Sequence, residues 1–416
     1  MKNDPLISDP AHAIIAGCNS ESSRHVQMQI GVVIAGFCTF LPLYATQPLL
    51  PEFRRIFSAS ALATSLTVSA VTIAIALASP WVGSVADSIG RKRVIVTAIL
   101  GLAVPSCMAA TSSSLHQLIA WRFAQGLFVP GIIAVALAYI AEESAEGTTA
   151  SLMSAYVTGT VFGGMCGRFF SATIAAYYDW QIAFYFLGSI TAGCGILTWI
   201  VLPRSRRFVR QRDPLAPLRS MFVHLHNPRL LATYLIGFNS LFTLVGIFTY
   251  VNFYLAEEPF HLGLVALGSV FLVYGLGLIV TPTAGPQIDR YGYRAAVFAA
   301  AAITASGALL TLIPLTWCVI LGLAVLSSGL FIMQSAVSSH VGKAAQEARS
   351  SAAGLYVCFY YLGGSAGATL LGWLWKWNGW NACVLCVVMI QLISAAVALR
   401  FFLPADHSPV QENGPT

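Results

Sequence analysis

The chain has 416 residues, of which 57% are hydrophobic and only 9% are charged, and its formal net charge is +6. Soluble proteins carry about 25% charged residues, so this composition excludes an ordinary soluble domain. A bilayer core requires about 20 apolar residues per helix, and the chain is long enough for twelve such helices. Because the lipid core offers no water to backbone groups, each apolar run is predicted to be an α-helix.

Apolar runs follow one another along the chain between two short polar ends. Residues 1–28 lack a basic region followed by an apolar core and are predicted to form a solvated cytoplasmic tail, not a cleaved signal. Residues 404–416 are interpreted in the same way. The predicted spans are residues 29–51, 61–82, 94–112, 116–141, 149–173, 181–203, 230–255, 262–284, 295–314, 316–338, 350–374 and 380–403.

One polar segment occurs twice between these spans. Residues 83–93 have the sequence GSVADSIGRKR and follow the second span, whereas residues 285–294, with the sequence GPQIDRYGYR, follow the eighth span about 200 residues later. A duplication of this length predicts two similar helix bundles in one all-α membrane protein. We expect six-helix bundles at 29–203 and 230–403, joined by a basic cytoplasmic linker at 204–229.

Lys and Arg residues lie mostly on one side of the predicted membrane. Of the 22, only Arg54, Arg55 and Lys376 fall on the outer side, Arg122 and Arg168 fall within spans, and the rest are cytoplasmic if both termini are cytoplasmic. Cationic segments stay on the side of synthesis, so both termini are assigned to the cytoplasm. The basic run in the linker is interpreted as a topology signal with some attraction to anionic lipid, in preference to a nucleic-acid patch.

The repeated polar segments and the spans around them resemble one known family over residues 29–403. They resemble the signature of the major facilitator superfamily, and residues 118–126, with the sequence LIAWRFAQG, are similar to the motif of its fourth helix. Residues 163–168 and 360–364 look most like the YnfM-type branch, near the drug:proton antiporters. The resemblance implies a twelve-helix secondary carrier that works by alternating access. The signature residues are Gly83, Asp87, Gly90, Arg91 and Lys92, with Gly285, Asp289 and Arg290 in the second copy.

The resemblance also implies that the signature segment is a gate at the cytoplasmic end. Asp87 would lie at the positive N-terminus of the eleventh span, near residues 350–351. Arg91 would pair with Glu142 or Glu143 at the inner end of the fourth span, and such contacts would bias a two-state equilibrium. The alternative is a polar turn that is needed only for insertion and topology.

Glycines are expected to have two tasks in this chain. Gly83 and Gly90 are expected to permit tight turns and close backbone approach in the signature segment. Small residues at four-residue spacing on the fifth and eleventh spans predict close helix packing. These are Gly159, Gly163, Gly167, Gly363 and Gly367.

Arg122 and Arg168 lie inside predicted spans, where an arginine at a helix centre costs about 2.5–3.5 kcal/mol. The repeat does not require them, because the other half has Gly322 and Ala368 about 200 residues later. A role in a transport pathway or in coupling is favoured for both. The alternative is snorkelling to the membrane surface, because each lies roughly 8–9 Å from an end of its span.

The distribution of charge favours an anionic or neutral amphiphilic substrate. No Asp or Glu lies in the middle of a predicted span, so a cationic substrate would lack a buried carboxylate to neutralise it. Polar and aromatic residues near mid-depth are expected to line a cavity between the halves, with ordinary core packing as an equal alternative for the aromatic ones. They are Tyr44, Gln47, Asn239, Tyr274, Gln334 and Tyr360.

No pattern of residues indicates an enzyme. Residues 363–367 match GxSxG only inside an apolar helix, whereas a nucleophile elbow requires a strand and a sharp turn. No ATP-binding loop or metal-binding pair occurs, so no cofactor and no metal are expected. The predicted function is proton-coupled efflux of a small amphiphile across the inner membrane, performed by a monomer without a nucleic-acid partner. Uptake of a small organic anion by proton symport and a transport-inactive sensor are the alternatives.

Overall fold

The computed structural model describes residues 10–144, 148–205, 224–344 and 349–402, and within these ranges every regular element is a helix. The N-terminal half contains α1 (Pro10–Leu43), η1 (Gln47–Leu49), α2 (Leu50–Ile56), α3 (Ala61–Ile89), α4 (Arg91–Ala109), α5 (Leu115–Phe128), α6 (Pro130–Glu143), α7 (Thr149–Tyr177) and α8 (Trp180–Val201). The C-terminal half contains α10 (Pro228–Ala256), α11 (Leu264–Ser269), η2 (Val270–Leu276), α12 (Gly277–Leu310), α13 (Thr316–Ala344) and α14 (Arg349–Phe401).

These helices form twelve membrane crossings. Nine stretches of the described chain are long and apolar enough to span a membrane. Two of the nine contain two crossings each, because α12 is broken at Gly292 and α14 is broken at Asn378 and Gly379. The remaining crossing is α7, which packs along α1.

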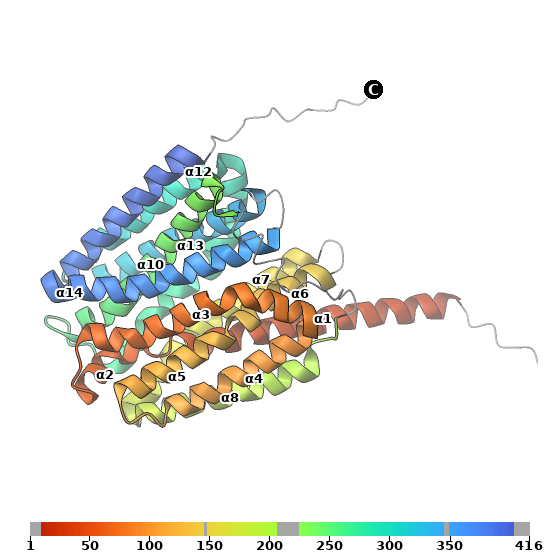
Figure 1. The fold of residues 1–416 in the computed structure, drawn as a ribbon, viewed down its shortest axis with the longest axis horizontal. Helices are drawn as coiled ribbons and strands as arrows, with labels where there is room; N and C mark the ends of the chain where they lie inside the picture. Colours follow the sequence, from red (N-terminus) through yellow and green to blue (C-terminus); the bar gives the residue numbers. More distant parts are fainter. Residues whose placement is uncertain (1–9, 145–147, 206–223, 345–348, 403–416) are drawn as a thin grey trace, which may run out of the picture.

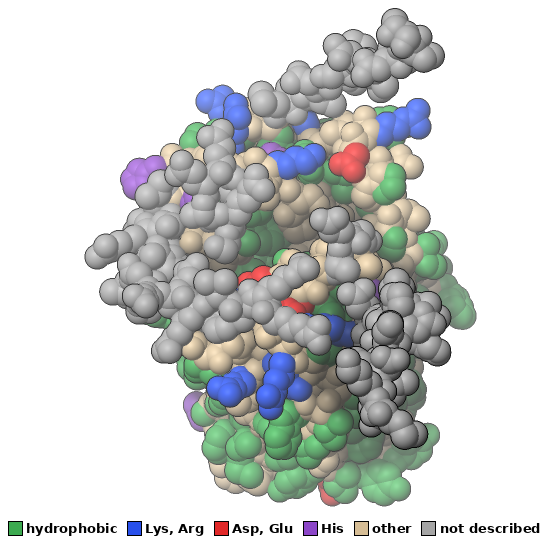
Figure 2. Space-filling model, turned by 90° about the vertical axis from the view of Figure 1, so that its right-hand side faces the viewer, with side chains coloured by type: hydrophobic (Ala, Val, Ile, Leu, Met, Phe, Trp, Pro, Cys, Tyr) green, Lys and Arg blue, Asp and Glu red, His purple; other side chains and the backbone are tan. Residues whose placement is uncertain are grey.

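The two halves lie side by side, with α3 of the first half against α14 of the second (Figure 1). Within the halves, α1 packs against α7, α4 against α8, α10 against α14 and α12 against α13. The cytoplasmic end, which faces the viewer in Figure 2, carries clusters of Lys and Arg side chains, in agreement with the orientation that the basic segments predict.

The first span is broken near its prolines, where the positions of Pro42, Pro48 and Pro51 predict a bend. α1 begins at Pro10, inside the stretch expected to be a tail, and ends at Leu43. After a turn, η1 and α2 continue the crossing, with Pro48 and Pro51 in their first turns. Proline lacks a backbone N–H, so it is tolerated in the first turn of a helix but interrupts a helix interior. These prolines therefore explain why the first span consists of three pieces.

The repeated polar segments are helical over most of their length, whereas the predicted spans end before them, at residues 82 and 284. α3 continues through Gly83, and α12 continues through Gly285. The chain turns at Gly90, with φ 104°, and at Gly292, with φ 82°, angles that only glycine adopts at low cost. A Cβ at Gly83 or at Gly90 would meet nothing within 4 Å, so the expected close backbone approach was wrong at both residues.

The outer part of α3 forms hydrogen bonds between the halves, to the first crossing of α14 and to α10. The Ser65 hydroxyl donates to the Ala368 carbonyl at 3.0 Å, and the Tyr250 hydroxyl donates to Ser65 at 3.0 Å. One turn further along α3, Ser69 and Thr369 share a hydrogen bond of 2.8 Å between their hydroxyls. These contacts hold the halves together on the outer side.

Candidate functional site

Arg122 on α5 is enclosed within the N-terminal half, with 0% relative exposure. Its Nε donates to the Thr67 carbonyl at 3.2 Å, and its Nη1 donates to the Pro42 carbonyl at 2.8 Å. Further hydrogen bonds go to the Leu43 carbonyl and to the Gln125 amide oxygen. Carbonyls in the last turn of a helix have no partner within the helix, so Arg122 caps the broken end of α1. The snorkelling interpretation is wrong for this residue.

Arg168 on α7 lies at the contact between the two halves and is 3% exposed, so it does not snorkel either. Its Nε donates to the Gln47 side-chain oxygen at 2.8 Å, and its Nη1 donates to a backbone carbonyl one turn earlier at 2.7 Å. The guanidinium carbon lies 4.7 Å from the ring centre of Tyr44, 4.8 Å from that of Phe271 and 4.9 Å from that of Tyr274. Two of these rings belong to η2, so both halves surround the same cation.

Gln47 connects Arg168 to the other half of the molecule. Its side chain is fully buried, and its Nε2 donates to the Thr249 hydroxyl on α10 at 3.2 Å. The two residues are 202 positions apart, which is about the length of the sequence repeat, so corresponding regions of the two halves meet here. We call Arg168, Tyr44, Gln47, Thr249, Phe271 and Tyr274 the Arg168 cluster.

The Arg168 cluster holds a cation without a neutralising carboxylate. Among the described residues Arg168 forms no ion pair, and its Nη2 has no hydrogen-bond partner there. A guanidinium over aromatic faces gains about 2 kcal/mol or more when it is desolvated, which helps to hold the charge in place. No group of three His, Cys, Asp or Glu side chains in the described chain could hold a metal ion. The cluster can therefore offer a charged donor and aromatic surface to a ligand.

The other predicted cavity residues lie in the C-terminal half. Asn239 donates to the Ser394 hydroxyl at 2.9 Å, so its amide supports the bundle and does not reach the Arg168 cluster. Gln334 accepts a hydrogen bond from the Tyr356 hydroxyl at 3.3 Å. Tyr360 stacks on Tyr356 with 5.7 Å between ring centres and packs against the buried core that contains the cluster tyrosines. Gln334 and Tyr360 are half-buried.

Three residues of the site were not predicted. Phe271 precedes Tyr274 by three positions, and side chains with this spacing are aligned in a 3₁₀ helix such as η2. Thr249 has a weak signal in the repeat, because it lies about one repeat length after Gln47. Tyr356 had no signal beyond its position one helical turn before Tyr360.

Two ion pairs between described residues lie at the inner end of the N-terminal half. Arg91 donates to Glu142 through Nε at 3.1 Å and through Nη2 at 2.7 Å, which is one of the two pairings that the resemblance implies. Arg24 donates to Glu143 at 2.6 Å, and the Glu143 side chain is only 2% exposed. The side chain of Asp87 lies outside the described side chains. The gating role of the signature segment therefore stays a prediction.

The second copy of the signature has weaker contacts. Asp289 lies 3.9 Å from Lys343, and the two side chains are 75% and 67% exposed. Arg290 lies over the ring of its neighbour Tyr291 at 5.2 Å. A Cβ at Gly285 would meet nothing within 4 Å. Exposed pairs of this kind contribute about 0–1 kcal/mol, so the described contacts at the two inner ends differ in strength.

Five glycines allow two helix pairs to pack with their backbones almost in contact. A Cβ added at any of them would lie between 1.8 and 2.3 Å from a carbonyl oxygen of the facing helix, which is α1 for α7 and α10 for α14. No other residue fits such a distance, so the geometry agrees with the packing role that the spacing predicts. They are Gly159, Gly163, Gly167, Gly363 and Gly367.

Sequence comparison identifies the family of this two-bundle membrane protein. The sequence profile of the Major Facilitator Superfamily matches residues 32–368 and 266–416. The chain belongs to the major facilitator superfamily. It is 33% identical to the MFS-type transporter YybF of Bacillus subtilis (strain 168), over 86% of this chain and 89% of the relative. It is 30% identical to the inner membrane transport protein YnfM of Escherichia coli (strain K12), over 95% of this chain and 94% of the relative.

Solved structures of transporters share this fold. A bacterial homologue of the human lysosomal transporter Spinster, in an inward-facing and occupied conformation, has a TM-score of 0.73 at 12% identity, with 90% of this chain and 96% of that chain covered. The predicted architecture of twelve helices in two six-helix halves is thus confirmed. The chain is a multi-pass membrane transporter of the superfamily.

Proposed function

We propose that the Arg168 cluster binds the anionic group of a small amphiphilic substrate during alternating access. The observation that carries this proposal is a buried guanidinium surrounded by aromatic rings from both halves, with no ion pair to any described residue. Ionised hydrogen bonds to such a cation are about twice as strong as neutral ones. Aromatic rings around one charged group also provide the apolar lining that is typical of small-molecule sites.

The contacts between the halves support a state that is closed to the outside. Ser65, Ser69 and Gln47 lie in the outer part of the N-terminal half, and each contacts the C-terminal half. The ion pair of Arg91 with Glu142 instead joins two helices of one half. A site at the contact of two rocking bundles is exposed to one side at a time, so this state would load substrate from the cytoplasm.

We extend the proposal to proton-coupled efflux through the inner membrane by a single chain. The similarity to an inner membrane transport protein supports the location. The resemblance of residues 163–168 and 360–364 to the branch near the drug:proton antiporters supports the direction and the coupling. Uptake of an organic anion by symport is the second candidate, and the same cluster would serve it with the opposite direction of net flux.

Proteoliposomes with an imposed pH gradient test this function. Anionic, neutral and cationic amphiphiles are added in turn, and proton movement and substrate flux are recorded for the wild type, Arg168→Gln and Arg168→Lys. A charged hydrogen bond contributes about 1.5–3 kcal/mol, so Arg168→Gln is expected to raise KM for an anionic substrate roughly 10–100-fold. Arg168→Lys keeps the charge but loses the planar stacking and is expected to be intermediate. The matched control is Arg55→Gln, whose side chain is 79% exposed on the outer side.

Each outcome of this experiment has a defined meaning. Transport of cationic compounds alone, unaffected by Arg168→Gln, would overturn the proposed site. Anion flux in the same direction as the proton flux would establish symport in place of efflux. Anion flux without proton movement would retain the site and reject the coupling.

A further inference from the structure

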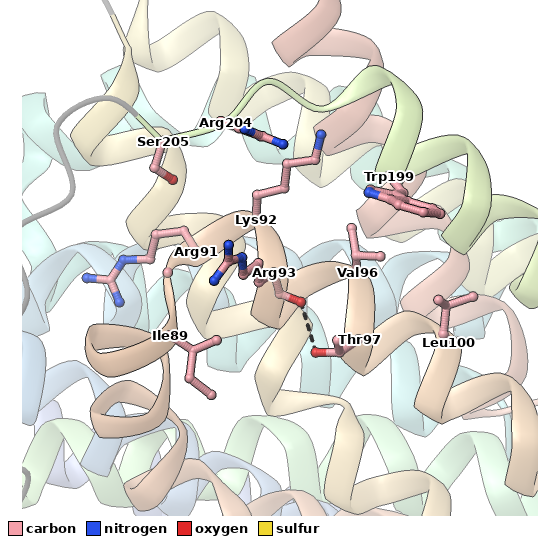
Figure 3. A pocket seen from close by; sticks show the side chains of 11 residues that line it. Ile89, Arg91, Lys92, Arg93, Val96, Thr97, Leu100, Trp199, Arg204 and Ser205 are labelled. Carbon is pink, nitrogen blue, oxygen red and sulfur yellow. Dashed lines mark hydrogen bonds between the residues drawn. The ribbon is translucent and has the colours of Figure 1, made fainter.

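A pocket of about 790 Å³ opens at the cytoplasmic ends of α4 and α8 (Figure 3). It lies on the side of the N-terminal half that faces away from the C-terminal half (Figure 1), apart from the Arg168 cluster. Its floor is the first turns of α4, and its rim is the segment that follows α8. The lining includes four cations, and Thr97 and Ser205 are its other polar side chains, while the apolar wall includes Leu100 and Trp199. The cations are Arg91, Lys92, Arg93 and Arg204.

Three of the four cations of this pocket lack a carboxylate partner within the described chain. Lys92 and Arg204 converge in Figure 3 and are close enough to repel each other. In the described part of the chain, none of Lys92, Arg93 and Arg204 forms an ion pair, whereas the neighbouring Arg91 points away from them toward Glu142. Like charges that converge cost energy at short range unless an anion lies between them.

A second observation also indicates a polar ligand. The Ser205 hydroxyl oxygen is buried without a hydrogen-bond partner among the described residues, and Figure 3 shows it directed toward the first turn of α4. α4 begins after Gly90, which provides no side-chain cap, so its first backbone N–H groups also require acceptors. A buried hydroxyl without a partner destabilises the protein, and a ligand oxygen in the pocket would recover the missing hydrogen bond.

The surroundings of the pocket indicate that this ligand also has an apolar part. Trp199 and Ile200 on α8 are 64% and 72% exposed, and Ile196 and Leu197 on the preceding turn are 52% and 45% exposed. A helix face of this composition lies against lipid and not against water. Tryptophan is enriched at the level of the lipid headgroups, so Trp199 places the pocket at the depth of the cytoplasmic interface.

We propose that this pocket binds the headgroup of one anionic phospholipid from the cytoplasmic leaflet. The phosphate oxygens accept hydrogen bonds from Lys92, Arg93 and Arg204, and the Ser205 hydroxyl donates a further one. An acyl chain continues along Leu100 and Trp199 toward the membrane interior. The bound lipid removes the repulsion between Lys92 and Arg204 and joins the inner ends of α4 and α8.

Native mass spectrometry of the full-length protein tests this proposal. The purified chain is titrated with phosphatidylglycerol or with zwitterionic phosphatidylcholine, and the dissociation constant of the first bound lipid is measured. Each cation near a membrane contributes about fivefold to anionic lipid affinity, so Arg93→Gln with Arg204→Gln is expected to weaken phosphatidylglycerol binding by about 25-fold. The matched control is Arg294→Gln with Arg400→Gln, which removes two cations from the inner end of the other half.

Further variants and ligands distinguish a bound lipid from other anions and control for misfolding. Arg93→Lys with Arg204→Lys keeps both charges and is expected to restore binding to within about threefold of the wild type. Equal affinity for the two lipids, or an equal loss in the control pair, would overturn the proposal in favour of solvated cations that only fix topology. Displacement of phosphatidylglycerol by millimolar inorganic phosphate would also overturn it, because the site would then recognise a free anion.

Discussion

Arg122 and Arg168 are both buried cations inside the membrane, but their hydrogen bonds go to different parts of the molecule. Every described hydrogen bond of Arg122 goes to the N-terminal half, where the guanidinium caps the end of α1. Arg168 instead meets residues of both halves and keeps Nη2 uncommitted within the described chain. This difference favours a structural task for Arg122, where the sequence favoured a role in transport or coupling.

Replacement of Arg122 by Gln is expected to lower stability more than it changes substrate affinity. Removal of a buried cation from its acceptors leaves the Pro42, Leu43 and Thr67 carbonyls without a charged donor, at a cost of about 3 kcal/mol. Thermal unfolding in detergent measures this effect, with Arg55→Gln as the exposed control. An unchanged unfolding temperature together with lost transport would reject the capping role and support coupling.

The helix elements owe their arrangement to a few residues at their contacts and ends. α7 packs on α1 because glycines remove the side chains that would separate the two backbones. Pro48 and Pro51 divide the first span, and this division places Tyr44 and Gln47 next to α7. The broken helix therefore builds one side of the Arg168 cluster, and Arg122 stabilises the break.

Gly163→Ala and Gly193→Ala are expected to have opposite effects on stability. A Cβ at Gly163 would lie 2.1 Å from the Phe37 carbonyl oxygen, so α7 must move away from α1 at a cost of about 1–3 kcal/mol. A Cβ at Gly193 on α8 would meet nothing within 4 Å, so this change is expected to stabilise the helix by about 0.5–1 kcal/mol. Unfolding in a denaturing detergent compares the two variants. Equal stability would show that the helices separate without strain.

At the scale of the whole molecule, two contacts on the outer side join residues that are about one repeat length apart. Gln47 bonds to Thr249 across 202 positions, and Arg54 bonds to Glu257 across 203 positions. Both pairs join the two halves on the outer side, at positions about one repeat length apart. Loss of these contacts should change the balance between the two states.

Ser65→Ala with Ser69→Ala is expected to increase the fraction of molecules open to the outside. Each hydroxyl contributes about 0.5–1.5 kcal/mol to the contact between α3 and α14, so the equilibrium should shift by roughly tenfold. Spin labels at the outer ends of the two halves measure the populations by their distance distribution. The control is Thr72→Val on the same helix, because Thr72 bonds only to backbone oxygens of α3. Unchanged populations in the double variant would show that these hydroxyls do not hold the closed state.

Several parts of the site were predictable because they depend on local sequence or on the repeat. The family resemblance implied that Arg91 pairs with Glu142 or Glu143, and the structure has the pair with Glu142. The close approach at Gly163 follows from regular spacing. The position of Asn239 was not predictable, because its helix face depends on the rotation of α10 within its bundle. Each residue turns a helix by about 100°, so a small error in rotation moves a side chain from the contact between halves to the bundle interior.

The sequence by itself determined the membrane class, the orientation, the twelve helices and the two-bundle architecture. These properties follow from composition, from the side on which basic residues gather and from a repeat, none of which requires knowledge of contacts. Only the tertiary structure decided which arginine caps a helix and which one joins the halves. It also brought Phe271 to Arg168 and Thr249 to Gln47, because the 3₁₀ geometry of η2 and the break in the first span set the directions of Phe271 and Gln47.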